Sequence, residues 1–599
     1  MLMESGSGQT GLSLEFLEGS LTMAGILLAL AFPRTGAAQF QAIERFFAAI
    51  ALRRRMSILL VGLSAIVLRV ALLPLLSAPL PFTPNDFSFL LSADTFLHGR
   101  LTNPTPALWM HFETIHVTML PTYNSMYFPA VGLLLAASKI VFGHPWFGLL
   151  GVAALMCAAI CWMLQAWVPP QWALLGGLLA VVHLGVFSYW VNSYTGGGSI
   201  AALGGALILG ALPRMLRVIR VQHLMLMATG IILVGFTRPY EGTLLCVPVL
   251  ARLVVWLKQG RDVPSRGVLL RTSALPLALV VGAVYWLGYY DYRNFGNPTT
   301  LPYTVDRATY AIAPYFIWQK PRPEPHYRHE SIREFYEDEA RQFYPASSAG
   351  VFLKGRLLMA VGEVRFFCGL ALLPVLLGLP LAVLDRRIRV LSVLLLILLL
   401  GFVPAGYVIP HYLAPFTAVM YGIGIQGMRH LRVWRRDGGA PGLSLLRMSI
   451  LICAVIAILR PFDKFLGMPV RGPQSSDWNF TWYGPDHFGT ERADMERRLG
   501  ELPGKQLVLV HYAKSHLPLN EWVYNSADID TSKVIWAHDM GPADNLDLIH
   551  AYANREVWIV DPDQAPVGLA PYTSAARSSP RVVESTLKGA GSVAGVERQ

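Results

Sequence analysis

The stretch "TPNDFSFLLSADTFLHGRLTNP", residues 83–104, places a carboxylate where it could act as a base. Asp86 follows Pro84 and Asn85 at the start of a predicted helix, just beyond a long apolar run. A hydroxyl is a weak nucleophile until a base takes its proton, and an aspartate can be that base. Alternatively, Asp86 caps the helix or complements its dipole from the first turn. Residue type and spacing leave both interpretations open.

A second carboxylate, Asp94, lies eight residues further along the same predicted helix. It falls among the apolar residues of the helix, where a charge needs a partner. His98 and Arg100 are near enough in sequence to supply one. Asp94 is therefore either half of a structural ion pair or a second site residue.

A third acidic candidate, Glu113, stands in "HFETIHV" between His111 and His116. Carboxylate and imidazole groups together can hold a divalent cation. The spacing is no recognised metal signature, so a metal ion is neither predicted nor excluded.

The segment 191–198, "VNSYTGGG", contains two polar site candidates, Asn192 and Tyr194. Its three glycines allow a phosphate or a sugar to approach the backbone closely. They are equally typical of small residues that let helices pack closely in a membrane. The segment contains no carboxylate.

Two further motifs carry candidates for binding a phosphorylated ligand. In "TRPYEG", Arg238 could hold phosphate oxygens, since a planar guanidinium matches their geometry, with Tyr240 and Glu241 beside it. The alternative is an Arg238–Glu241 pair that closes a loop. In "VIPHYLAPF", His411 and Tyr412 could line the same pocket or simply lie at the membrane interface.

Three other charged residues lie beside or within apolar runs. Glu363 and Arg365 precede the apolar run 366–385, at an edge where they could contact a ligand. Arg69 falls inside the run 56–78, and an arginine at membrane depth is often functional because burying it is costly. It could also pair within a helix bundle.

The composition of the chain indicates the class of protein in which these residues are placed. Of 599 residues, 54% are hydrophobic and 15% are charged, against about 25% charged in soluble domains. The chain is therefore predicted to be a polytopic membrane protein. Its net charge of +11 does not indicate nucleic-acid binding, because the arginines cluster beside apolar runs, where they set orientation.

The positive-inside rule orients the predicted helices. Arg53, Arg54 and Arg55 precede the first run, which places them in the cytoplasm and Asp86 outside. About eleven spans keep every basic cluster on one side: 56–78, 146–168, 171–190, 199–213, 222–237, 241–258, 267–288, 366–385, 390–406, 411–428 and 444–461. The stretch 129–142 is too short to span and is predicted to lie at the outer interface.

The sequence thus predicts an α-helical polytopic membrane protein with outer interfacial helices and a small extracytoplasmic α/β domain. Residues 1–55 are expected to be a cytoplasmic extension, because "MAGILLALAF" is too short to span. In the C-terminal region strand-like and helix-like segments alternate, and the end is rich in Ser, Ala and Gly. The predicted parts are 1–55, the membrane domain 56–461 with outer loops 79–145 and 289–365, the α/β domain 462–572, and a disordered tail 573–599.

The order of these motifs resembles the GT-C superfamily of polytopic glycosyltransferases, in the bacterial branch related to protein O-mannosyltransferases and lipid A aminoarabinose transferases. The likeness covers roughly residues 56–430 and is carried by "NDFSFLLSADTFLHGRLTNP", "PTYNSMYFPAVGLLLAASKIVFG", "VNSYTGGGSIAALGGAL" and "TRPYEG". It implies a polyprenyl-phosphate-linked sugar donor, a site on the outer face of the bacterial cytoplasmic membrane, and Asp86 as the base for the acceptor. Many relatives have a second acidic residue in the second outer loop; Glu241 could replace it here.

The resemblance leaves the sugar open, and the acceptor could be a lipid, a glycan or a protein. It names no certain cofactor and leaves a divalent metal open. The aromatic and charged loop 289–350 is expected to act as a lid. Two other functions compete: a flippase of lipid-linked saccharides, which would need charges along a central path and repeat symmetry, and an O-antigen-type ligase, which would rely on Arg and His rather than an aspartate. The charges gather at the outer edge instead, which favours a transferase over a flippase, and the acidic first outer loop argues against the ligase. The expected reaction is a single displacement, which inverts the anomeric centre.

Overall fold

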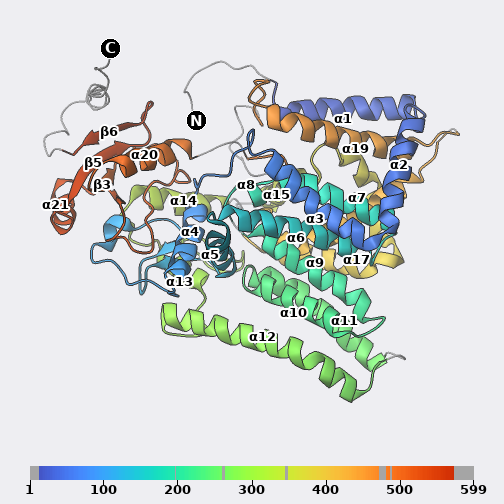
Figure 1. The fold of residues 1–599 in the computed structure, drawn as a ribbon, viewed down its shortest axis with the longest axis horizontal. Coiled ribbons are helices and arrows are strands. Elements are labelled where there is room, and N and C mark those ends of the chain that lie inside the picture. The colour runs from blue at the N-terminus through green and yellow to red at the C-terminus, as the bar shows by residue number, and fades with distance from the viewer. Residues whose placement is uncertain are drawn as a thin grey trace, which may run out of the picture.

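The computed structural model describes residues 12–195, 197–259, 263–343, 349–436, 438–470, 481–485 and 489–572. Long helices lie side by side in a bundle, and the short outer helices and the C-terminal sheet gather at one end of it (Figure 1). The predicted fold class, a mainly helical membrane protein with a small C-terminal α/β part, is confirmed.

The bundle is built from twelve named helices among the described residues. They are α1 (Leu14–Ala31), α3 (Arg54–Ala71), α6 (Trp146–Leu164), α7 (Pro170–Ala180), α9 (Gly198–Met215), α10 (Val221–Gly235), α11 (Pro239–Gln259), α12 (Arg266–Phe295), α15 (Ala349–Cys368), α17 (Arg389–Phe402), α18 (Thr417–Arg432) and α19 (Pro441–Leu459). In the described part of the chain, seven helical segments are long and apolar enough to cross a membrane, or eight if a bent pair counts as one span. The predicted number of eleven membrane spans stays a prediction, because α10, α17 and α18 are short and α3 carries three arginines.

Two of the predicted spans are broken rather than straight. The helix α7 continues through a π-helical turn, η2 (Val181–Val186), into the short α8 (Tyr189–Asn192). The helix α15 ends in a bend of 108° before η3 (Leu373–Gly378) and α16 (Leu379–Leu384). Gly369 lies at this bend with φ +61°, and a Cβ there would meet Trp482. The outer loop 289–365 stays a prediction, and within it the helix α15 begins at Ala349.

The N-terminal region also differs from the prediction. The helix α1 is eighteen residues long, because it begins at Leu14 rather than near Met23, and it is a candidate span. It packs antiparallel to α19: Leu14 donates to the carbonyl of Pro469, while Pro33 lies beside Gly439. Residues 14–31 therefore pack with the bundle, and the cytoplasmic extension expected at 1–55 stays a prediction. The helix α2 (Ala37–Leu52) runs across the ends of α1 and α3 (Figure 1).

The outer layer consists of short elements between the bundle and the sheet. They are α4 (Pro84–Leu97), η1 (Trp109–Phe112), the paired strands β1 (Val117–Thr118) and β2 (Asn124–Ser125), α5 (Ala130–Phe142), α13 (Pro302–Tyr310) and α14 (Glu330–Phe343). The helix α5 has thirteen residues, which agrees with the prediction that this apolar stretch is too short to span. Short turns η4 (Arg386–Ile388), η5 (Ala414–Phe416) and η6 (Arg460–Phe462) adjoin α17, α18 and α19.

The C-terminal part is a four-stranded sheet in the order β4–β3–β5–β6. The strands β3 (Lys505–Val510), β4 (Val534–His538) and β5 (Arg555–Asp561) are parallel, and β6 (Gly568–Pro571) pairs antiparallel with β5. The helix α20 (Thr490–Glu501) precedes β3, and α21 (Pro542–Ala551) connects β4 to β5. The predicted tail 573–599 lies outside the described residues.

The sheet shares its hydrophobic core with the outer layer instead of standing apart. Leu91 of α4 and Phe112 of η1 pack in one cluster with Leu507, Ile535 and Leu548. By contrast, Trp482 and Tyr483 pack in the core of the bundle. Part of the segment predicted to belong to the C-terminal domain 462–572 therefore packs with the membrane helices.

Candidate active site at the outer end of the bundle

Asp86 lies in the first turn of α4 and forms a capping box with Thr83. The N-cap residue Thr83 is extended, and its hydroxyl accepts a hydrogen bond from the backbone N–H of Asp86 over 3.3 Å. In return, Oδ2 of Asp86 accepts from the backbone N–H groups of Thr83 and Phe82, at 3.0 and 3.2 Å, and from the Thr83 hydroxyl at 3.0 Å. Such reciprocal bonds satisfy the free donors at a helix start. The structural interpretation of Asp86 is thus confirmed, and a catalytic role would come in addition to it.

The other carboxylate oxygen of Asp86 faces Thr195 in the segment 191–198, which is the second outer loop of the predicted topology. Thr195 donates its hydroxyl proton to Oδ1 of Asp86 over 2.8 Å, and Asp86 is buried. Burial raises the pKa of Asp86, while the hydrogen bonds from Thr83, Thr195 and Phe82 oppose this shift. A raised pKa makes the carboxylate a better proton acceptor.

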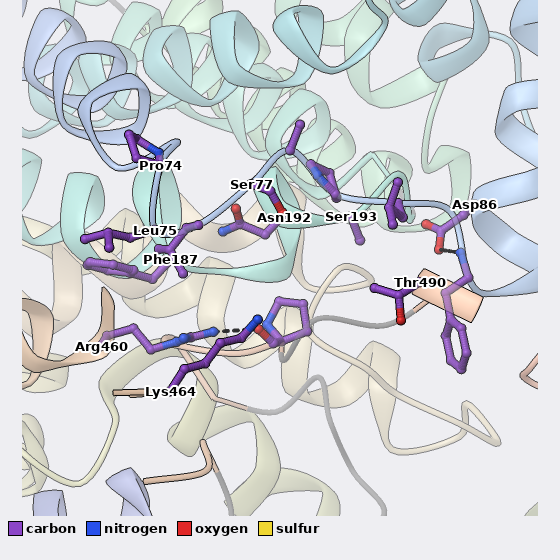
Figure 2. Close-up of a pocket in the computed structure, with 16 residues that line it drawn as sticks. Pro74, Leu75, Ser77, Asp86, Phe187, Asn192, Ser193, Arg460, Lys464 and Thr490 are labelled. Carbon is purple, nitrogen blue, oxygen red and sulfur yellow. Dashed lines mark hydrogen bonds between the residues drawn. The ribbon is translucent and has the colours of Figure 1, made fainter. Parts of the chain in front are cut away.

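Asp86 forms part of the wall of a cavity of about 310 Å³. The other walls come from the loop 74–82, from Asn192 and Ser193 of the second outer loop, and from the segments around Arg460 and Thr490. Figure 2 shows Asp86 and Thr490 at one end of this cavity and Arg460 with Lys464 at the other. The cavity therefore has a carboxylate at one end and two cationic side chains at the other.

The two cations differ in their contacts. Arg460 is buried and donates to the carbonyls of Tyr483 and Pro485 and to the carboxylate of Asp463, which fixes the segment that follows α19. Lys464 is exposed, and its ammonium makes no hydrogen bond or ion pair with any residue that the structure describes. Of the two, Lys464 is the one able to turn toward an anionic ligand.

Asn192, a predicted site residue, lines this cavity and is held by Arg69. The buried guanidinium of Arg69 donates to Oδ1 of Asn192 at 2.9 Å and to the carbonyls of Leu76 and Ser77 at 2.8 and 2.9 Å. Arg69 is thus paired inside the bundle, where it holds two cavity walls together. The other candidate of this loop, Tyr194, is buried in an apolar cluster and does not line the cavity.

The candidates of "TRPYEG" and "VIPHYLAPF" gather outside this cavity. The guanidinium of Arg238 lies over the ring of Tyr412 at 4.4 Å and donates to the hydroxyl of Tyr303 at 3.5 Å. Both Arg238 and Glu241 are buried, and their charged groups make no ion-pair contact with each other in the described structure. The close contacts of Arg238 are thus with aromatic side chains, while the charge of Glu241 acts on it through space.

The remaining two candidates of these motifs make separate contacts. His411 is buried, and its Nδ1 lies 2.9 Å from the hydroxyl of Tyr189. Tyr240 is partly exposed and donates to the carbonyl of Gly401 at 2.8 Å. None of Arg238, Tyr240 or His411 lines the cavity beside Asp86.

The two other acidic candidates have structural partners. Oδ2 of Asp94 accepts from the backbone N–H of Ala527 at 2.8 Å, and Oδ1 lies 3.8 Å from the imidazole of His98. Asp94 thus connects α4 to the C-terminal sheet. Nδ1 of His98 lies nearer to the backbone carbonyl of Asp94, at 2.8 Å, so an ion pair between the two side chains stays a prediction. Glu113 accepts from the hydroxyl of Tyr310 at 2.8 Å and lies 3.6 Å from Arg328. Burial raises its pKa.

The histidines that flank Glu113 in sequence point away from it. His111 faces the carbonyl of His538, and His116 faces the hydroxyl of Tyr127. Over the described ranges, the structure brings together no group of three or more His, Cys, Asp or Glu that could hold a metal ion. The described residues of the loop 289–350, which is expected to be a lid, do not form part of the cavity wall.

Sequence reasoning missed Lys464, Arg460 and Thr195. One signal could have found the first two: Arg460 lies at the end of the last predicted span, 444–461, and Lys464 follows it, on the side where the positive-inside rule expects few basic residues. Thr195 has no such signal, because only the fold brings the second outer loop to Asp86.

Comparison with solved structures finds two kinds of membrane transferase. The oligosaccharyltransferase of Archaeoglobus fulgidus, in complex with Zn and sulfate, matches with a TM-score of 0.45 and 10% identity, over 84% of this chain and 67% of that one. ArnT from Cupriavidus metallidurans matches in the apo state with a TM-score of 0.44 and 13% identity, over 88% of this chain and 94% of that one. Bound to undecaprenyl phosphate, ArnT matches with a TM-score of 0.43 and 11% identity, over 86% and 93%.

Both proteins belong to the GT-C superfamily that the sequence resembles. At TM-scores below 0.5, neither similarity transfers a substrate, a mechanism or a site residue to this chain. No protein-family model matches the chain, and no curated protein matches it in sequence.

Proposed function

We propose that the chain is a membrane glycosyltransferase that moves a sugar from a polyprenyl-phosphate-linked donor to an acceptor hydroxyl. The observation that carries the proposal is the cavity between Asp86 and Lys464, which pairs a buried carboxylate with an exposed cation at the outer end of a helical bundle. A transfer from a lipid phosphate needs both groups: a base for the acceptor and a positive charge for the leaving phosphate.

The reaction would be a single displacement. The acceptor oxygen forms a bond to the anomeric carbon of the sugar while the bond from that carbon to the phosphate oxygen breaks. The electron pair of the broken bond leaves with the lipid phosphate, and the acceptor proton moves to the carboxylate of Asp86. The anomeric configuration inverts, because attack comes from the face opposite the leaving group.

Thr195 marks the direction from which an acceptor would approach. Its hydroxyl already donates to Oδ1 of Asp86 at 2.8 Å, the geometry that a general base needs toward an acceptor hydroxyl. An acceptor would take the place of this hydroxyl after Thr195 rotates. Oδ2 would stay in the capping box, which keeps the carboxylate oriented.

Lys464 is better placed than Arg238 to bind the phosphate of the sugar donor. Lys464 lines the cavity that contains Asp86, whereas Arg238 lies outside it against Tyr412. A flexible ammonium can follow a phosphate as a point charge. In this proposal Arg238, with Tyr412, Glu241, Tyr240 and His411 near it, contributes to a more distant part of the donor site.

The proposal covers every class of acceptor that offers a hydroxyl: lipid, glycan or protein. The cavity is proposed to open on the outer face of the bacterial cytoplasmic membrane, because Arg53–Arg55 stand at the start of α3 and Asp86 follows its end. The C-terminal sheet packs on the same outer layer and is proposed to lie on the same side.

The test is transfer of a labelled sugar from polyprenyl phosphate by the purified chain in detergent. Transfer to an added acceptor extract, with release of polyprenyl phosphate, is the expected result. A flippase would move lipid-linked sugar only across a sealed membrane and would form no new glycosidic bond in detergent. Movement in proteoliposomes without any transfer in detergent would overturn the proposal.

A further inference from the structure

A second cavity, of about 490 Å³, lies where the C-terminal sheet meets the start of α14. Its walls come from the ends of β3 and β4, from the residues that follow these strands, and from the segment 328–334. The two strands are parallel neighbours, and their last residues, Val510 and His538, pair in register. Open α/β sheets bind ligands outside the carboxyl ends of such strands, and pockets for small molecules measure about 300–1,000 Å³. The cavity therefore has the position and the size of a ligand site.

Three buried histidines line this cavity, and each uses one ring nitrogen to hold a neighbouring segment. Nδ1 of His516 donates to the carboxylate of Asp563 at 2.8 Å. Nε2 of His538 and Nε2 of His329 donate to two backbone carbonyls of the segment 110–113, at 2.8 and 2.7 Å. Carbonyl and carboxylate oxygens only accept, so the ring nitrogen that faces them carries the proton.

The second nitrogen of each neutral ring is left as a hydrogen-bond acceptor. These nitrogens bond to no residue that the structure describes, and none of them is closed off from solvent. The three side chains themselves are more than nine-tenths buried. Burial lowers the pKa of His329 to about 4 and that of His538 well below its usual value, so both rings are neutral near pH 7. Buried polar atoms are almost always paired, so three free acceptors in one wall indicate a ligand that donates.

The charges of the wall exclude one class of ligand. Four carboxylates and two cationic side chains line the cavity. Glu330 and Asp544 are exposed to solvent, where a carboxyl group is ionised at neutral pH. One of the cations, Arg328, already lies 3.6 Å from the buried carboxylate of Glu113. An anionic ligand would therefore meet an excess of like charge, which disfavours it.

A row of stacked rings holds the three acceptors in place. The rings of His329 and His538 stack at 3.8 Å, and so do those of Tyr512 and His516. Tyr512 also meets His538 edge-on at 5.6 Å, which joins the two stacks. The acceptors come from the start of α14, the end of β4 and the loop after β3, so they are spread over separate walls. They are fixed before a ligand arrives, and a ligand that satisfies them donates in several directions.

We propose that this cavity binds an uncharged sugar unit. A sugar carries several hydroxyl donors around one ring and no charge that the carboxylates would repel. The site goes beyond the proposed transfer reaction and is separate from the cavity of Asp86, with which it shares no wall residue. Because the segment 328–334 forms one wall, a bound sugar would connect the loop 289–350 to the C-terminal sheet.

The experiment is saturation-transfer NMR on the purified full chain, without a polyprenyl-linked donor and in a detergent whose head group contains no sugar. The probes are the methyl glycosides of glucose, galactose, mannose and N-acetylglucosamine. At least one should bind with a Kd of about 1 mM or below, and its 6-phosphate should bind about tenfold more weakly. No saturable binding of any glycoside, or tighter binding of the 6-phosphate, would overturn the proposal. So would binding of the 2-amino sugar alone, which would indicate a site for cations.

Two variants place the sugar in this cavity. Ala513→Trp fills the cavity from an exposed wall position without removing a hydrogen-bonding side chain, so it should abolish binding. Ser515→Trp is the matched control: Ser515 is exposed two positions further on, outside the wall, and its variant should bind like the wild type. His516→Asn keeps an N–H group for Asp563 but removes Nε2, so it should lower the affinity about three- to tenfold.

If Ala513→Trp and His516→Asn melt like the wild type and bind the sugar like it, the sugar does not occupy this cavity and the proposal fails. Ala513→Trp keeps the test decisive if His516→Asn does not fold. Because no polyprenyl-linked donor is used, failure here is distinct from failure of the transferase proposal.

Discussion

Thr195 donates a hydrogen bond to Oδ1 of Asp86 over 2.8 Å, which joins the second outer loop to the first turn of α4. The same carboxylate caps α4 through Oδ2. One side chain therefore has a structural role at one oxygen and a proposed catalytic role at the other. Substitutions can separate these roles, because only the catalytic role depends on the proton affinity of the group.

Asp86→Asn should lower sugar transfer by about 10²- to 10⁴-fold, since an amide cannot take the acceptor proton. The amide oxygen can still accept from the backbone of Thr83, so the fold should persist. Thr83→Ala is the matched control: it removes the capping hydroxyl, costs about 1 kcal/mol of stability, and keeps the base. Transfer rates and melting temperatures of both variants check this, and near-normal turnover of Asp86→Asn at wild-type expression would contradict it.

Lys464→Gln should weaken donor binding about 10- to 100-fold, the loss expected for one charge-assisted hydrogen bond. Lys464→Arg keeps the positive charge and should therefore retain part of the affinity for the sugar donor. Lys514→Gln, another exposed lysine that lies in the C-terminal domain, serves as the control for a change of net charge. Titration of the donor against each variant measures the affinity. Unchanged affinity of Lys464→Gln would place the phosphate elsewhere.

If Arg238 contacts the sugar donor, Arg238→Ala should weaken binding of the sugar donor more than Arg238→Lys does. Lysine keeps the positive charge but loses the two parallel N–H groups of the guanidinium. Arg238 and Glu241 form no hydrogen bond or ion pair among the described residues, although their charges act on each other through space. If the contacts with Tyr303 and Tyr412 place Arg238, Glu241→Gln should not reproduce the arginine variants. Donor binding and melting temperature are measured on all three variants. If the folded arginine variants bind donor normally, Arg238 only packs against Tyr412 and Tyr303.

Thr531→Cys should react with an impermeant thiol reagent in intact cells, because the C-terminal sheet packs on the outer layer that contains Asp86. Thr531 is exposed, whereas the neighbouring Ser526 is partly buried and bonded to Ser532. The five native cysteines lie in bundle helices, buried or partly buried, and provide the background. Labelling only after lysis would refute the predicted orientation.

Stability should fall as pH rises from about 4 to 7, and Asp306 should cause part of this fall. Burial raises the pKa of Asp306 to about 7, although Arg307 opposes the shift, while an unfolded aspartate titrates near 3.9. The folded chain therefore binds this proton more tightly, and the contribution of Asp306 to stability is full below the unfolded pKa and lost as pH rises through the folded one. Its Oδ2 accepts from the hydroxyl of Tyr336 at 3.1 Å, and Oδ1 has no partner among the described residues.

Asp306→Asn should flatten this pH dependence, because the amide does not titrate. Melting temperatures in detergent from pH 5 to 8 measure the effect. Asp338 is an exposed residue of α14, and Asp338→Asn is the control. It should leave the slope of melting temperature against pH unchanged. A slope in Asp306→Asn equal to that of the wild type would show that other groups, such as Glu113, account for it.

The sequence by itself determined the membrane class, the positions of most helices and the strand–helix alternation of the C-terminal part. Long apolar runs and their flanking arginines are local signals, and hydropathy over about 20 residues reads them directly. The same local chemistry determined the capping of α4, since Thr83 and Asp86 are three residues apart. The hydropathy of the sequence did not predict the full length of α1, because Glu15 and Glu18 interrupt its apolar stretch. The structure accommodates these two acids because Arg365, Trp482 and Tyr483 contact them from distant parts of the chain.

Only the tertiary structure decided which polar residues meet. Thr195 reaches Asp86 across 109 positions, and Trp482 reaches His183 from beyond the last helix of the bundle. The same holds for Lys464, which shares a cavity with Asp86, and for Arg238, which does not. Spacing along a sequence predicts neighbours only within a helix or a strand, whereas these contacts are set by how separate helices end and pack at one face of the bundle.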